Sequence, residues 1–96
     1  MRLVYAGLAV GDLDRLRRFI ATHDPAAARR TVDRLIARVE RLAAFPAMGR
    51  EVDLGSAMFP VRQLAFDAYV VRYMVTADAV IVLRIRHHRE DEGSAS

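Results

Sequence analysis

The sequence predicts a two-layer α+β domain in which a pair of helices covers one face of a sheet. The first half of the 96-residue chain has apolar residues at helical spacing, whereas residues 58–87 alternate apolar and polar positions as strands do. A short apolar-rich segment, Arg2–Tyr5, precedes the helices and predicts an N-terminal strand. The expected order is strand, helix, helix and then three strands, all in one sheet.

The two helices are expected to form an antiparallel hairpin. In the first, over residues 9–22, the positions at helical spacing are Leu13, Leu16, Phe19 and Ile20. The second begins with Asp24 as N-cap and Pro25 at a position where no backbone N–H is needed. Its apolar stripe consists of Ala28, Val32, Leu35, Ile36, Val39 and Leu42. The connection between the helices is too short for any arrangement other than a hairpin.

Alternating apolar and polar positions predict three strands, at residues 58–66, 69–75 and 79–87. Their short connections favour an antiparallel meander. Pro60 indicates that the first of them starts at an edge or a bulge. Alternation in the last strand places one set of residues toward the helices, namely Ile81, Leu83 and Ile85. The opposite set is Val80, Val82, Arg84 and Arg86. Residues 1–90 are expected to form one domain, and residues 91–96 a polar, disordered tail.

The composition excludes several kinds of site. Cysteine is absent, which rules out disulfides, thiolate nucleophiles and sulfur metal sites. Three histidines are too few for a histidine-built metal site, so we expect neither metal nor cofactor. The N-terminus resembles neither a signal peptide nor a membrane span, and we therefore expect a cytoplasmic protein that does not contact a membrane.

All 15 basic residues are arginines, and the net charge is +3. If the strands pair as a meander, Arg62, Arg72, Arg84 and Arg86 would gather on the sheet face away from the helices. His87, His88 and Arg89 would lie at its end. This cluster predicts an anion-binding surface for a nucleic-acid backbone or for acidic groups of a protein. The competing interpretation is a solvated face whose arginine stems cover apolar surface.

The histidine pair also has two interpretations. Histidine beside arginine suits a general base in metal-free phosphodiester cleavage, in which case Arg62, Arg84 and His87 would form the catalytic site. The alternative is a structural pair at the end of a strand, with one ring packed and the other exposed.

Three segments resemble the ParE/RelE superfamily of toxins. The run DPAAARRTVDRLIARVERLAAFPAMGRE resembles their second helix and following turn, and VGDLDRLRRFIA their first helix. The stretch VRQLAFDAYVVRYMVTADAVIVLRIRHHRED resembles their three terminal strands, so the resemblance covers nearly the whole chain. It implies the RelE/ParE-like two-layer fold and the toxin role in a bacterial type II toxin–antitoxin module.

The resemblance also implies a ParD-like antitoxin as partner, with DNA contacted only indirectly through it. On the second helix, Arg30, Arg34 and Arg38 repel one another at i, i+4 spacing, and an acidic partner helix would relieve that repulsion. Together with Leu64 and Phe66 they are the candidates for antitoxin binding.

Two target classes exist in this superfamily: RelE-like members cleave mRNA on the ribosome, and ParE-like members inhibit DNA gyrase. Ala65 stands at a position where the nucleases carry arginine, and the residues after Arg89 read EDEGSAS, without tyrosine or a further basic residue. These departures favour a non-enzymatic gyrase inhibitor. The target-binding candidates are then Arg62, Arg72, Arg84, Arg86, His87, His88 and Arg89. The alternatives are a metal-free endoribonuclease and a degenerate toxin that acts only as a corepressor.

Overall fold

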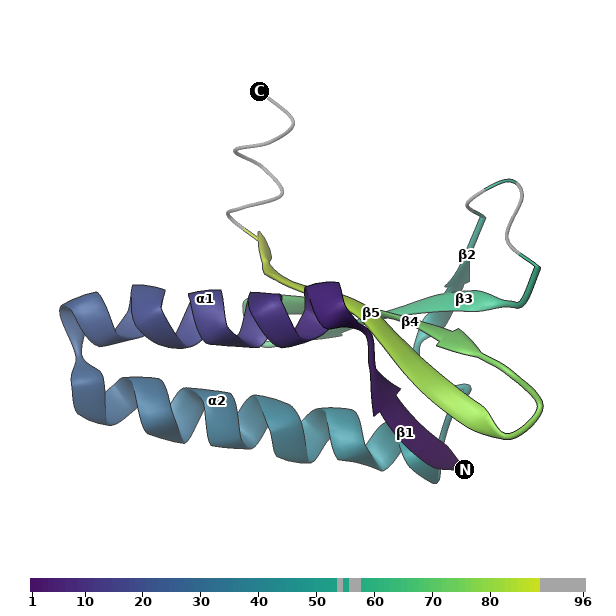
Figure 1. Cartoon of the computed structure of the whole chain (residues 1–96), viewed down its shortest axis with the longest axis horizontal. Helices are drawn as coiled ribbons and strands as arrows, with labels where there is room; N and C mark the ends of the chain where they lie inside the picture. Colours follow the sequence, from purple (N-terminus) through teal and green to yellow (C-terminus); the bar gives the residue numbers. More distant parts are fainter. Residues whose placement is uncertain (54, 56–57, 89–96) are drawn as a thin grey trace.

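The computed structural model describes residues 1–53, 55 and 58–88. Strand β1 (Arg2–Tyr5) is followed by helices α1 (Gly7–His23) and α2 (Pro25–Glu40) and the 3-10 turn η1 (Arg41–Ala43). Strands β2 (Arg50–Val52), β3 (Val61–Phe66), β4 (Tyr69–Val75) and β5 (Ala79–His87) complete the fold. Figure 1 shows the helices running antiparallel, with the sheet at the end of the hairpin that carries β1.

The described strands form one five-stranded sheet in the order β1-β5-β4-β3-β2. The hairpins β3–β4 and β4–β5 are antiparallel, which confirms the predicted meander and the α+β class. Strand β1 lies parallel to β5, and the short edge strand β2, absent from the prediction, pairs with β3. Strand β3 starts at Val61 rather than at residue 58, because Pro60 has no N–H to donate; its carbonyl still accepts from the N–H of Val75 at 3.0 Å.

The helix ends follow the local sequence. Helix α1 starts at Gly7, two residues before the predicted position, and Ala6 at its N-cap makes no side-chain hydrogen bond. Helix α2 has the predicted cap, in which the Asp24 carboxylate accepts a hydrogen bond of 3.1 Å from the N–H of Ala27. The adjoining Pro25 occupies the first turn, as expected.

The core lies between the helix hairpin and one face of the sheet. Its helical members include Leu16, Leu35, Val39 and Leu42, and its strand members include Tyr69, Val71, Tyr73, Val80, Val82 and Ile85. Phe19 does not belong to it: the ring is 59% exposed and stands edge-on to His23. Helical spacing alone therefore did not decide which apolar residues of α1 enter the core.

A bulge in β5 reverses the predicted faces in the first half of that strand. Arg72 pairs with Arg84 and Tyr73 pairs with Val82, so Leu83 is an extra residue on the β5 side. Val80 and Val82, predicted to face away, are completely buried, whereas Ile81 and Leu83 are only half-buried. Beyond the bulge the prediction holds again: Ile85 is buried, and Arg84 and Arg86 are on the other face.

In the described part of the chain, no helix is both long and apolar enough to cross a membrane. The expected polar tail, residues 91–96, lies outside the described residues.

Candidate functional site

The sheet face away from the core, called the outer face here, carries a row of polar side chains across three strands. Gln63, Arg72 and Arg84 are direct neighbours on β3, β4 and β5, and cross-strand neighbours share a face. Together with Val70 and Arg86 they line a pocket of about 290 Å³. Among the described residues, its walls hold three arginines and no carboxylate, so this lining favours an anion.

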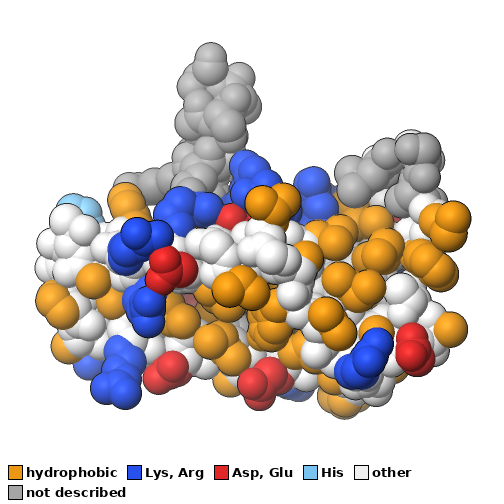
Figure 2. Space-filling model, viewed as in Figure 1, with side chains coloured by type: hydrophobic (Ala, Val, Ile, Leu, Met, Phe, Trp, Pro, Cys, Tyr) orange, Lys and Arg blue, Asp and Glu red, His pale blue; other side chains and the backbone are white. Residues whose placement is uncertain are grey.

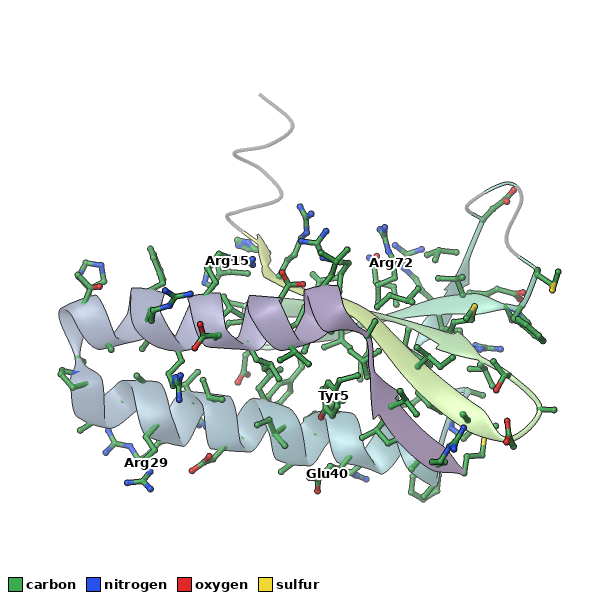
Figure 3. All side chains as sticks on the ribbon, viewed as in Figure 1. Tyr5, Arg15, Arg29, Glu40 and Arg72 are labelled. Atoms are coloured by element: carbon green, nitrogen blue, oxygen red, sulfur yellow. The ribbon has the colours of Figure 1, made fainter. Side chains whose placement is uncertain are left out.

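Figure 2 shows basic side chains along the upper edge of the molecule, and Figure 3 places Arg15 and Arg72 on that edge. Arg29, by contrast, projects from α2 on the opposite side. The predicted convergence of Arg72, Arg84 and Arg86 is therefore confirmed as a placement in the fold. Their role in target binding stays a prediction.

Asp12 of α1 fixes one of these arginines. After β1 ends, α1 runs along the freed edge of β5, and Asp12 accepts a hydrogen bond of 2.8 Å from the backbone N–H of Ile85 there. The same carboxylate accepts from Nε of Arg84 at 2.9 Å and from its Nη2 at 3.1 Å. Arg15 donates a further bond of 2.7 Å. Because Asp12 is only 2% exposed, it holds the Arg84 guanidinium in one orientation.

The charge of Asp12 is stabilised by these donors. Burial alone would raise the pKa of this carboxyl group. The hydrogen bonds from Arg84, from the Ile85 N–H and from Arg15 outweigh burial and lower the pKa from 3.8 to about 2. Asp12 is therefore ionised at neutral pH. No local sequence pattern links Asp12 to a partner 72 residues away.

Arg62 does not lie on the outer face, and that prediction was wrong. It pairs with Tyr73, whose ring is in the core, so its side chain starts on the helix-covered side of the sheet. There it donates a hydrogen bond of 2.7 Å to the carbonyl of Gly49. The β3–β4 register, which sequence alternation alone does not give, decides this placement.

The histidines also lie apart from Arg72 and Arg84. His87 pairs with Tyr69 and stands edge-on to its ring at 5.3 Å between centroids, on the helix side of the sheet. Since Arg84 is on the outer face, the two residues lie on opposite faces. His88 is tilted against His87 at 5.5 Å. The remaining candidate, Arg89, lies outside the described residues.

The antitoxin-binding candidates form a mixed surface of α2 and β3. Arg30, Arg34 and Arg38 are exposed, as predicted for the polar side of α2. The Arg38 guanidinium lies 4.7 Å from the centre of the Phe66 ring, which brings a helix candidate and a strand candidate together. Leu64 and Phe66 themselves are partly buried against the core.

Within residues 1–53, 55 and 58–88, no cluster of three histidine, aspartate or glutamate side chains could hold a metal ion. The outer-face pocket therefore offers a ligand arginine guanidinium groups, a glutamine amide and an apolar side chain.

Comparison with known proteins places this geometry in a family. The family model described as "ParE toxin of type II toxin-antitoxin system, parDE" matches residues 3–92. The chain belongs to this family. This membership confirms the ParE/RelE resemblance. The chain is therefore a toxin of the type II toxin–antitoxin class.

Relatives and solved structures agree with this membership. Toxin RelE3 of Caulobacter vibrioides is 37% identical over 79 residues, which span 82% of this chain and 85% of that protein. Toxin RelE2 of the same organism is 34% identical and covers 90% of this chain and 93% of its own. A chain from the structure of the chromosomal ParDE system of P. aeruginosa superposes with a TM-score of 0.72 at 23% identity, over 91% of this chain and 95% of that one. The RelB-RelE complex of Methanococcus jannaschii gives a TM-score of 0.55 at 15% identity, over 97% of this chain and 99% of that one.

Proposed function

We propose that this ParE-family chain is neutralised by a cognate antitoxin and inhibits DNA gyrase by binding, without catalysing a reaction itself. One observation supports the second half of this proposal: the three side chains predicted for a ribonuclease site are not assembled. Arg84 is on the outer face, whereas Arg62 and His87 are on the helix side.

Each of these side chains also has a structural role. Arg62 secures the turn that contains Gly49, and Arg84 binds the buried carboxylate of Asp12. His87 packs against Tyr69 at the end of β5. A general base must come within hydrogen-bond reach of the reacting group and of its orienting partners, which this arrangement does not provide.

The antitoxin half of the proposal is supported by the systems in which similar folds occur. The two structural neighbours come from a ParDE system and from a RelB-RelE antitoxin–toxin complex. In this chain, the exposed side of α2 offers Arg30, Arg34 and Arg38 beside Phe66, a surface that suits an acidic, partly apolar partner segment.

The names of the relatives leave one alternative worth testing. Both Caulobacter relatives are named RelE, which suggests a ribosome-dependent mRNA endoribonuclease as the second candidate. Such an enzyme would need a catalytic set other than Arg62, Arg84 and His87, because these three lie on different faces.

The test is DNA supercoiling by purified gyrase in the presence of the antitoxin-free chain. We expect inhibition or trapped DNA cleavage, reversed by the antitoxin. Arg72→Gln should weaken inhibition, because it removes a charge from the outer face. Arg29→Gln, which removes the same charge from the opposite side of the molecule, should not.

Absence of any effect at a large excess of folded protein would refute gyrase inhibition. A ribosome-dependent mRNA cleavage assay with the same protein, and with His87→Gln as a variant, then tests the alternative. Ribosome-dependent cleavage by the folded chain would establish the enzyme instead, and cleavage retained by His87→Gln would show that the catalytic set does not include His87.

A further inference from the structure

The sheet has two edges, β1 and β2, which differ in the side chains they carry. In the described part of the chain, no strand lies beyond β1 at one end of the sheet or beyond β2 at the other (Figure 1). Strand β1 has the sequence RLVY, whereas β2 has the sequence REV and is followed by Asp53. Unpaired backbone groups at a sheet edge favour pairing with another strand, and charged side chains oppose it. The apolar β1 edge is therefore the more open of the two.

The backbone of β1 directs hydrogen-bonding groups toward its free edge. The N–H of Ala6 donates to the Val82 carbonyl of β5 at 2.9 Å, and the N–H of Arg2 donates at 3.1 Å on the same side. Backbone groups alternate in direction along a strand, so those of Leu3 and Tyr5 point away from β5. The bonds to β5 also hold β1 extended, with these donors and acceptors in line.

We propose that β1 pairs antiparallel with β1 of a second copy of this chain, about a twofold axis at Val4, so that the two sheets become continuous. In this register Leu3 lies opposite Tyr5 of the second copy, and Tyr5 lies opposite its Leu3. Each of these two residue pairs exchanges two backbone hydrogen bonds. The proposal goes beyond antitoxin and gyrase binding and depends on neither.

The side chains of β1 suit this register. Residues directly opposite one another in a strand pair lie on the same face of the sheet. Val4 would meet Val4 of the second copy on the outer face, and Leu3 would meet Tyr5 on the helix side. Arg2 would face Ala6, so no like charges oppose each other. Leu3, Val4 and Tyr5 are only half-buried in the single chain, and pairing would remove more of their apolar surface from water.

The same symmetric pairing at β2 would bring like charges together in each register centred on the strand. With the axis at Arg50, two arginines face each other, and with the axis at Glu51, two glutamates do. With the axis at Val52, Glu51 faces Asp53 of the second copy. Like charges directly opposite destabilise a strand pair. The charge pattern therefore favours β1 over β2 as the edge that pairs.

The first test is cross-linking through a single introduced cysteine, because the chain has none of its own. In the proposed register, position 4 faces itself at a non-hydrogen-bonded site, where Cα atoms are about 4.5 Å apart. Val4→Cys should therefore give a disulfide-linked dimer, with its two thiols oxidised while oxidised glutathione is reduced. Leu3→Cys should not, because its counterpart lies two positions along the partner strand, beyond the reach of about 7 Å.

The second test is analytical ultracentrifugation of the antitoxin-free chain. We expect a dimer fraction that rises with concentration between about 1 and 500 µM, as for a small interface. Val4→Lys should weaken dimerisation at least tenfold, because two like charges then face each other. Ala65→Lys adds the same charge at an exposed outer-face position of β3 and should change it less than twofold. Mixing Val4→Lys with Val4→Glu should restore dimers, since opposite charges then meet.

Three results would overturn the proposal: a wild-type chain that stays monomeric throughout this range, equal cross-linking of Val4→Cys and Leu3→Cys, or equal weakening by Val4→Lys and Ala65→Lys. The conservative Val4→Cys variant keeps the test decisive if Val4→Lys fails to fold. Protection of the Leu3 and Tyr5 amides from hydrogen exchange only after antitoxin is added would assign this edge to the antitoxin instead. None of these results depends on gyrase, so failure here is distinguishable from failure of the supercoiling assay.

Discussion

Asp12 of α1 and Arg84 of β5 are joined by two hydrogen bonds, of 2.9 and 3.1 Å, across 72 residues of sequence. The pair connects the buried side of the molecule with the outer face, because Asp12 is enclosed and Arg84 lines the pocket. It also closes the edge of β5 where β1 ends, since Asp12 accepts from the Ile85 N–H. The Asp12 carboxylate therefore contributes both to the stability of the fold and to the orientation of Arg84 on the outer face.

Asp12→Ala should lower the free energy of unfolding by about 3 kcal/mol, because it leaves the Ile85 N–H and the Arg84 guanidinium without their acceptor. Asp14→Ala is the matched control: Asp14 binds Arg17 and Arg18 on the exposed side of the same helix, and its loss should cost less than about 1 kcal/mol. Urea unfolding of both variants measures the difference. Equal destabilisation would show that Asp12 contributes no more than a surface ion pair.

Acid should remove the stabilisation that the ionised Asp12 carboxylate provides. The pKa of Asp12 is lowered from 3.8 to about 2 in the folded state, so its stabilisation is complete above pH 4 and disappears as the pH falls toward 2. That difference in pKa corresponds to about 2 kcal/mol of unfolding free energy. Urea unfolding between pH 2 and pH 6 should show this loss in the wild type and not in Asp12→Asn. A parallel slope in the variant would assign the acid sensitivity to other groups.

Gly49 should not tolerate a side chain. A Cβ there would lie 2.8 Å from the Gln63 carbonyl oxygen and 2.8 Å from the Tyr73 hydroxyl, both too close. Gly49→Ala should therefore destabilise the fold by about 2 kcal/mol. Gly11→Ala, in a helical position where an added Cβ meets no described atom within 4 Å beyond the neighbouring helix backbone, should instead stabilise it by about 0.5–1 kcal/mol. Thermal unfolding of the two variants should give melting temperatures that move in opposite directions.

The Tyr73 hydroxyl should matter, whereas that of Tyr5 should not. Tyr73 accepts from the Gly49 N–H at 2.8 Å and donates to the Pro46 carbonyl at 2.7 Å. Tyr73→Phe leaves both backbone groups without this partner and should cost about 1–3 kcal/mol. The Tyr5 hydroxyl is buried without a partner among the described residues, and burial, aided by Glu40, raises the pKa of Tyr5. Tyr5→Phe should thus be neutral or stabilising, which chemical denaturation can check.

The sequence by itself determined the elements whose signals are local. Asp24 and Pro25 mark the start of α2, and the apolar stripe from Ala28 to Leu42 selects its buried side. Short connections impose the two β-hairpins, β3–β4 and β4–β5. These features depend on residues within one or two turns of each other, so alternation and capping are sufficient to predict them. The arginines of β4 and β5 were placed on the outer face for the same reason.

The tertiary structure decided what depends on pairing between distant segments. The bulge at Leu83 shifts the alternation of β5 by one residue, and so buries Val80 and Val82 in place of Ile81 and Leu83. The register of β3 against β4 moves Arg62 away from the arginine row, and the path of α1 along β5 brings Asp12 to Arg84. A strand has a period of only two residues, so one extra residue or a one-step change of register exchanges its faces, and no local pattern specifies which register the assembled sheet selects.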